Sequence, residues 1–437
     1  MRWFKKTIPW RGEVVFRGSL QPRAADFEYL EKHRIRIRPG NGDPEFLWSL
    51  TLEHPDWGTA TLQCPRETHR IDPAILDHDW LLSETERQEA RLGESTVLLG
   101  MPSAKGHMLR DRKLALRFMR AIMGDDGVLG LDCLGWRTWT RTGLDEELAH
   151  DADLDVEAIH SLHWVKTESG EEAGWLHSHG LAEIGGFDFD ILRPAKELAT
   201  SACDALRAIA FAILEERVST STTRFSLAMP GGDVQFVDVD RFNALASAAD
   251  RALRTADDPA HSRKRAVLCD PAGGFFSRFS RKVRPSSYLA GPIDDRAVIC
   301  FSGSATDLMA ERARKTYPVL RALLDELAEF EFPVGAKIGY PTDHRTGPDD
   351  REHLWFSIHR CFDDKIDATL ENSPLDIAGM NAGDRAEHPV ELLTDWIIMT
   401  PFGQINPRSM VVVRKIREHR EELRAIMAEY RRQSSKA

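Results

Sequence analysis

The chain has 437 residues, of which 42% are hydrophobic and 29% charged, and its formal net charge at pH 7 is −11. This composition is typical of a globular protein, and the length predicts several domains, because one hydrophobic core rarely organises so many residues. The acidic balance argues against a protein that coats nucleic acid or an anionic membrane.

The sequence predicts a cytoplasmic protein. No segment approaches the roughly 18 consecutive apolar residues that a membrane-spanning helix needs. The basic start, residues 1–6, runs into a Thr-Ile-Pro-Trp segment without the apolar stretch of a signal peptide. The six cysteines stand singly, which is typical of reduced core residues and not of a disulfide framework.

Hydrophobic periodicity predicts a mixture of helices and strands in the first part of the chain. Ser83 followed by Glu86 has the spacing of a capping box at a helix start, and Gly124 is a typical helix stop. We expect strands over 46–52, 59–64, 97–100, 133–140, 162–166 and 174–179, and helices over 83–92 and 111–123.

Two changes of pattern divide the rest of the chain. A long helix is expected to begin at Pro194, and closely spaced short strands follow Phe332-Pro333. Between them we expect strands over 234–239 and 297–301, a helix over 242–253, and a helix beginning at Ser304 and kinked at Pro318. The predicted fold class is α+β, with mixed α+β domains at 1–193 and 194–332, then a small β-rich barrel-like or roll-like domain with a C-terminal helix at 333–437.

Most of the potential chemistry lies in the segment Trp175-Leu176-His177-Ser178-His179-Gly180-Leu181. His177 and His179 are separated by one residue, so on a strand both imidazoles point to the same face. His163 lies on the preceding predicted strand. If the hairpin register places it opposite His177 or His179, three imidazoles share one face, a common set of zinc ligands. A slip of one residue would put it on the other face.

Two segments resemble families of unknown function. One resemblance is to a bacterial domain with an I-H-x-V strand and a W-L-H-T-H-G-L strand. The matching segments are Leu162-His163-Trp164-Val165 and residues 175–181. Residues 352–413 resemble the YegJ-like domain, through His353-Leu354-Trp355-Phe356, Leu370-to-Pro374, Gly383-Asp384 and Asp395-Trp396. These resemblances imply an intracellular bacterial protein, and neither family brings an established reaction.

The segment from Ala173 to His179 also resembles the zinc-binding strand of JAMM-type isopeptidases, G-W-x-H-S-H-P followed by S-x-x-D. The resemblance implies that both histidines and an aspartate bind zinc, and Asp190 stands at the matching spacing. However, Gly180 replaces the proline and Phe187 replaces the serine, and the glutamate that activates water in that family cannot be assigned to any residue of this sequence. The alternative is that the histidines bind no metal and are structural residues on one face of a strand.

Since other catalytic motifs are missing from so long a sequence, we expect a non-catalytic protein that binds another macromolecule, in an accessory or immunity-like role. An acidic chain suits a basic protein partner, and we do not expect nucleic acid. The enzyme alternative is a metal-dependent hydrolase that uses the His177/His179 strand. In that case zinc is the expected cofactor, with His163, His177, His179 and Asp190 as candidate ligands.

Overall fold

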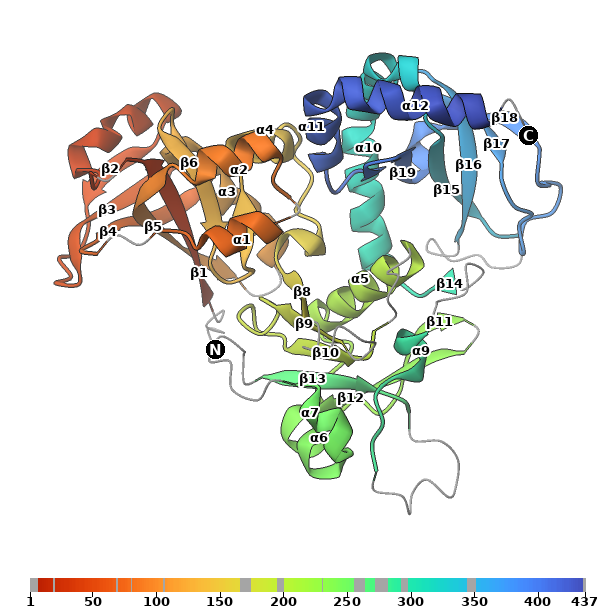
Figure 1. Cartoon of the computed structure of the whole chain (residues 1–437), viewed down its shortest axis with the longest axis horizontal. Helices are drawn as coiled ribbons and strands as arrows, with labels where there is room; N and C mark the ends of the chain where they lie inside the picture. Colours follow the sequence, from red (N-terminus) through yellow and green to blue (C-terminus); the bar gives the residue numbers. More distant parts are fainter. Residues whose placement is uncertain are drawn as a thin grey trace.

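The computed structural model shows three lobes, each built around one β-sheet (Figure 1). It describes residues 7–18, 20–67, 70–79, 81–104, 107–165, 174–194, 200–229, 231–254, 264–271, 282–291, 298–343 and 351–434. The chain is a mixture of helices and mainly antiparallel strands, which confirms the predicted α+β class. Among the described helices, none is long and apolar enough to cross a bilayer.

The first sheet has the strand order β2-β3-β4-β5-β1-β6-β7. Its strands are β1 (Thr7–Arg17), β2 (Arg36–Pro39), β3 (Phe46–His54), β4 (Gly58–Pro65), β5 (Gly93–Ala104), β6 (Gly127–Asp132) and β7 (Arg137–Trp139). The helices of this lobe are α1 (Pro73–His78), α2 (Glu84–Ala90), α3 (Met108–Met123) and α4 (Arg141–Leu148), with a 3-10 helix at Ala24–His33. The capping box of Ser83 and Glu86 is present. The expected strand over 133–140 is confirmed only at 137–139, which is β7, because residues 133–136 form the turn between β6 and β7.

The second sheet has the order β14-β11-β12-β13-β10-β9-β8, with β10 and β13 parallel. Its strands are β8 (Ser161–Val165), β9 (Trp175–His179), β10 (Asp188–Leu192), β11 (Phe225–Met229), β12 (Gly232–Asp238), β13 (Arg265–Cys269) and β14 (Val298–Ile299). The expected domain boundary at Arg193-Pro194 therefore falls inside one continuous sheet. Pairing of β10 with β13 joins the segments on its two sides, a long-range contact that local sequence does not reveal.

Helices cover both faces of this second sheet. Leu176 and Ile191 point to the face packed against α5 (Thr200–Leu214), while Trp175 and Val267 belong to a separate apolar cluster with Phe242 of α6 (Val239–Leu245). The smaller helices of this lobe are α7 (Ala248–Ala252) and α9 (Ser287–Ala290). The single helix expected over 242–253 is thus two short ones, because Ser247 begins a new helix as the N-cap of α7.

The third sheet is open, with the order β18-β17-β16-β15-β19-β20. Its strands are β15 (Val334–Pro341), β16 (Arg351–Cys361), β17 (Lys365–Leu370), β18 (Arg385–Pro389), β19 (Leu393–Thr400) and β20 (Gly403–Ile405). The edge strands β18 and β20 do not pair in the described part of the chain, so the expected barrel is wrong. The sheet instead packs against α10 (Gly303–Glu326), and α11 (Val411–Glu418) and α12 (Arg420–Ser434) complete this lobe.

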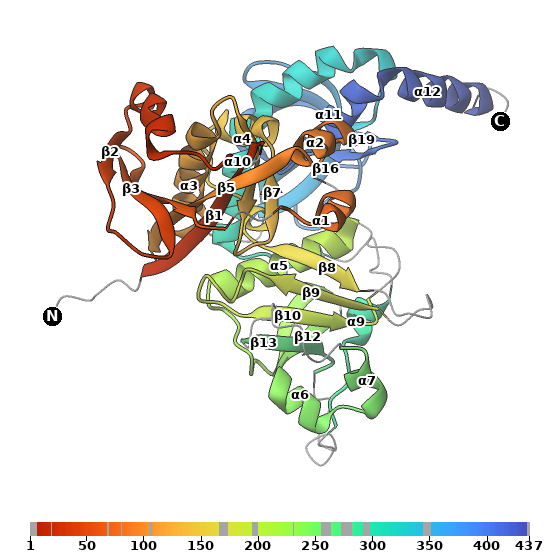
Figure 2. The ribbon, with the colours of Figure 1, turned by 60° about the vertical axis from the view of Figure 1, so that its left-hand side comes forward.

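Helix α10 begins at the second lobe and packs against the third sheet (Figures 1 and 2). Its N-cap is Ser302, not Ser304, and it continues through Pro318 as one helix. Residues 303–326 were expected to belong to the middle domain, but Ala313, Tyr317 and Leu320 share a core with strands of the third sheet.

Candidate metal centre

Three histidines meet on one face at the β8–β9 edge of the second sheet. His163 of β8 is directly opposite His177 of β9, and Ser161 is opposite His179. This is the register in which all three imidazoles share a face. One nitrogen of each of His163, His177 and His179 lies within 4.8 Å of the others. Of the two registers that the sequence leaves open, the structure has the one that brings the three histidines together, and metal binding stays a prediction.

The cluster is mostly enclosed. His177 and His179 are buried and His163 is partly buried. The ring centroids are 4.6 Å apart for His163 and His179, and 4.8 Å apart for His177 and His179. In a tetrahedral site with Zn–N bonds of about 2.0–2.1 Å, ligand nitrogens are separated by roughly 3.4 Å. For tetrahedral coordination of one ion, these nitrogens would have to approach one another by at most about 1.4 Å.

Trp136, which the sequence did not single out, packs against the histidines from the first lobe. Its ring stacks on His179 at 5.3 Å between centroids and meets His163 edge-on at 5.9 Å. Trp136 has a φ of +52°, a backbone conformation that costs energy for a large side chain, and it remains 49% exposed. Trp136 lies in the turn between β6 and β7, 43 residues before His179. Its place beside the histidines depends on the contact between the first and second lobes, which the sequence does not show.

Gly180 explains how that turn comes so close. Its φ is +107°, and a Cβ atom added there would lie 2.8 Å from the carbonyl oxygen of Ile159 and 2.9 Å from the Cα of Gly135. A larger residue cannot occupy this position without moving the turn that carries Trp136. The glycine that replaces proline in the isopeptidase-like segment therefore has a structural role in joining the two lobes.

Asp190 does not join the histidine cluster. It pairs with His177 in the strand register, but its carboxylate accepts hydrogen bonds from Arg254 Nε at 2.8 Å and Arg265 Nη1 at 2.7 Å. Both carboxylate oxygens are thus used in buried ion pairs. Among the residues that the structure describes, the ligand group contains the three histidines and no carboxylate.

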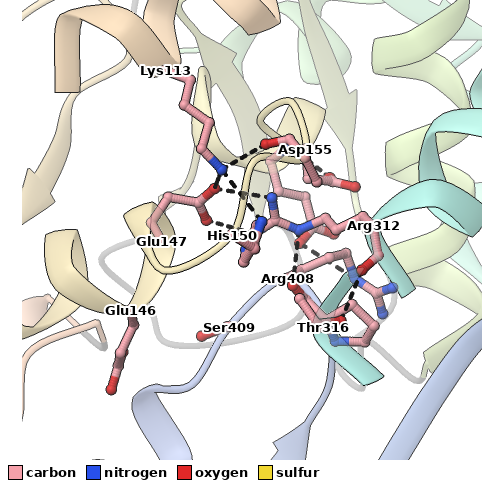
Figure 3. A network of polar contacts seen from close by, with 12 residues as sticks. Lys113, Glu146, Glu147, His150, Asp155, Arg312, Thr316, Arg408 and Ser409 are labelled. Atoms are coloured by element: carbon pink, nitrogen blue, oxygen red, sulfur yellow. Dashed lines mark hydrogen bonds and ion pairs between the residues drawn. The ribbon is translucent and has the colours of Figure 1, made fainter. Parts of the chain in front are cut away.

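A buried polar network, also not expected from the sequence, joins the first lobe to α10 and to the segment before α11 (Figure 3). Glu147 of α4 accepts hydrogen bonds from Arg312 Nη1 at 3.0 Å and from Lys113 Nζ at 3.2 Å. Arg312 also donates to the carbonyl oxygen of Pro407 at 2.8 Å. One guanidinium on α10 therefore holds together the first lobe and the segment that precedes α11.

Two regions of the chain match models of known families. Residues 162–278 match the C-terminal part of a protein of unknown function (DUF4026), and residues 309–405 match an uncharacterized protein conserved in bacteria (DUF2314). The chain thus carries segments similar to two uncharacterised families. Comparison with curated proteins and with solved structures gave no match.

The histidine cluster lies entirely within the DUF4026-like region, whereas Trp136 comes from the residues before it. The expected resemblance to families of unknown function is confirmed at this level. The W-L-H-T-H-G-L motif and the YegJ-like identity stay predictions.

Proposed function

We propose that this chain is a metal-binding protein whose His163, His177 and His179 hold one divalent transition-metal ion, with zinc as the expected ion. The observation that carries the proposal is the register of β8 and β9, which places three imidazoles on one face with ligand nitrogens within 4.8 Å. Imidazole suits zinc, copper, nickel and iron, whereas calcium and magnesium prefer oxygen ligands.

Binding is better supported than hydrolysis. A catalytic zinc site keeps one position open for water and needs a nearby carboxylate as the base. Three histidine ligands leave that fourth position available. However, no carboxylate belongs to the cluster among the described residues, and Asp190 is occupied by Arg254 and Arg265. We therefore propose a non-catalytic metal site that fixes β8 to β9, next to the ring of Trp136 from the first lobe.

The decisive experiment is titration of metal-free, full-length protein with Zn²⁺ in the presence of a competing chelator. We expect one site per chain, and His179→Ala should weaken binding at least 10-fold, because it removes one of three protein ligands. His359→Ala is the matched control, since His359 is an exposed histidine on β16. Equal binding by His179→Ala and the control would refute the proposal.

We also propose that the protein lies in the cytoplasm and binds a macromolecular partner there. Its support is the net charge of −11, which favours a basic protein partner through electrostatic complementarity. Affinity purification from the native cell at low and high salt tests this point. A stoichiometric basic partner that is lost at high salt is expected, and recovery of the protein alone at both salt concentrations would contradict it.

A further inference from the structure

A cavity of about 190 Å³ lies where the first lobe meets α10 and the segment before α11. It is separate from the histidine cluster and borders the polar network of Figure 3. The charged side chains that line it are unequal in number. They comprise the four arginines Arg137, Arg312, Arg408 and Arg414 and the two glutamates Glu146 and Glu147. His150, also in the wall, adds no positive charge at neutral pH, because burial lowers its pKa to about 4.

Most of these charges are matched by partners. Arg312 pairs with Glu147, Arg414 pairs with Glu86 and Glu146, and Arg408 pairs with Asp395 at 2.8 Å. The two glutamates in the wall are therefore already used by Arg312 and Arg414. Neither is left to neutralise another cation.

Arg137 is the exception. Within the described part of the chain, its guanidinium donates one hydrogen bond, from Nη1 to the carbonyl oxygen of Glu157 at 2.7 Å, and forms no ion pair. Its other contact is with the ring of Trp139, 4.8 Å from its Cζ. The side chain of Glu157 lies near but pairs with Arg207 at 3.2 Å. A partly buried cation without a carboxylate partner is costly, and a bound counter-ion would offset that cost.

We propose that this cavity binds a small oxyanion, a phosphate or a short carboxylate, with Arg137 as its principal ligand. A guanidinium presents donors in a planar fork that matches both kinds of oxyanion. The cavity volume admits only a small molecule. Among the described residues, Arg137 is the arginine of the wall that has no carboxylate partner, and its charge favours a negatively charged ligand. Ser409, which also lines the cavity, offers a hydroxyl group as a further donor.

The ligand would sit between two lobes. Arg137 and Glu146 belong to the first lobe, whereas Arg408 and Ser409 belong to the third. Binding of the anion should therefore stabilise the contact between them. It is independent of the metal site, so either proposal can fail without the other.

The test is calorimetric titration of the full-length protein with sodium phosphate and, in a second arm, with sodium malonate, each compared with sodium chloride at equal ionic strength. We expect saturable binding of at least one oxyanion. In Arg137→Met the dissociation constant should be at least 10-fold higher. Arg34→Met is the control, because Arg34 is an exposed arginine of the same lobe, is not part of the cavity wall, and pairs with Asp56 at 3.5 Å. Preference for phosphate or for malonate identifies the class of oxyanion.

A second variant keeps the proposal testable if Arg137→Met does not fold. Ser409→Leu fills part of the cavity and leaves every arginine in place, and it should also abolish saturable binding. The absence of saturable binding by both phosphate and malonate in the unmodified protein would overturn the proposal. Binding that is unchanged in either variant would overturn it as well.

Discussion

His163 lies directly opposite His177 across the β8–β9 pair, and this register decides the character of the site. A shift of one residue would have sent His163 to the opposite face of the sheet. The same pairing sets Ser161 against His179, and Ser161 Oγ lies 3.2 Å from Nε2 of His163.

Because His163 lies opposite His177, we expect that bound Zn²⁺ stabilises the fold and that His163 is one of its ligands. Zn²⁺ at 100 times its dissociation constant should raise the free energy of unfolding by about 2.7 kcal/mol, because the ion binds only the folded chain. In His163→Ala this increment should largely disappear. Urea unfolding with and without Zn²⁺ measures it, and an equal increment in both proteins would contradict the assignment of His163.

The stacking of Trp136 on His179 predicts an optical signal. Zn²⁺ binding should change the tryptophan fluorescence, because the ring next to Trp136 becomes a metal ligand. The chain has 11 tryptophans, so the assignment requires the Trp136→Phe variant. That variant should still bind Zn²⁺ but lose most of the fluorescence change. Retention of the full change would show that Trp136 does not report on the site.

Gly180→Ala should destabilise the protein by at least about 2 kcal/mol, through backbone strain at φ +107° and the close approach to Ile159. Gly231→Ala is the matched control, because Gly231 also has a positive φ, +86°, but open space around it. Urea unfolding of both variants separates crowding from backbone strain. Equal losses would show that the close packing at Gly180 contributes nothing.

Glu147→Gln should cost roughly 3 kcal/mol of stability, because it leaves the buried Arg312 and Lys113 without their shared carboxylate. Asp26→Asn provides the comparison. It breaks the exposed pair with Arg23, and solvent screens such a surface pair, so the loss should be much smaller. A loss below about 1 kcal/mol for Glu147→Gln would mean that this network does not hold the lobes together.

His150 predicts a pH dependence of stability. Burial lowers its pKa in the folded chain to about 4, from 6.5 when unfolded. Between these values the unfolded chain binds a proton that the folded chain does not, so stability falls as the pH drops from 6.5 to 4. The contribution is at most roughly 3 kcal/mol, and solvent reduces it because His150 is partly exposed.

The His150→Gln variant isolates this contribution from that of other titrating groups. Its stability should change less with pH over this window than that of the unmodified protein, as measured by urea unfolding at several pH values. Identical pH profiles would exclude a neutral, buried His150.

Local patterns in the sequence were sufficient to predict several helices and strands. They also predicted that His177 and His179 share one face of a strand. Ser83 with Glu86, and Gly124, marked helix ends because capping depends on neighbouring residues. The position of His163 required the hairpin register, which the segment 166–173 left open and which only the assembled sheet provides.

Features that depend on long-range contacts were missed. The second sheet joins strands on both sides of Arg193 through the pairing of β10 with β13. Arg312 and Glu147 are 165 residues apart, and no local pattern marks a buried pair at that separation. The spacing that suggested Asp190 as a ligand was also uninformative, because Arg254 and Arg265 engage its carboxylate.

The most direct test of the metal site is zinc X-ray absorption spectroscopy on full-length protein loaded with one equivalent of Zn²⁺. We expect three imidazole nitrogens at about 2.0–2.1 Å from the zinc and one further light atom, with loss of one imidazole in His179→Ala. A sulfur neighbour at about 2.3 Å, a shell of oxygen atoms alone, or a spectrum unchanged by the substitution would contradict it.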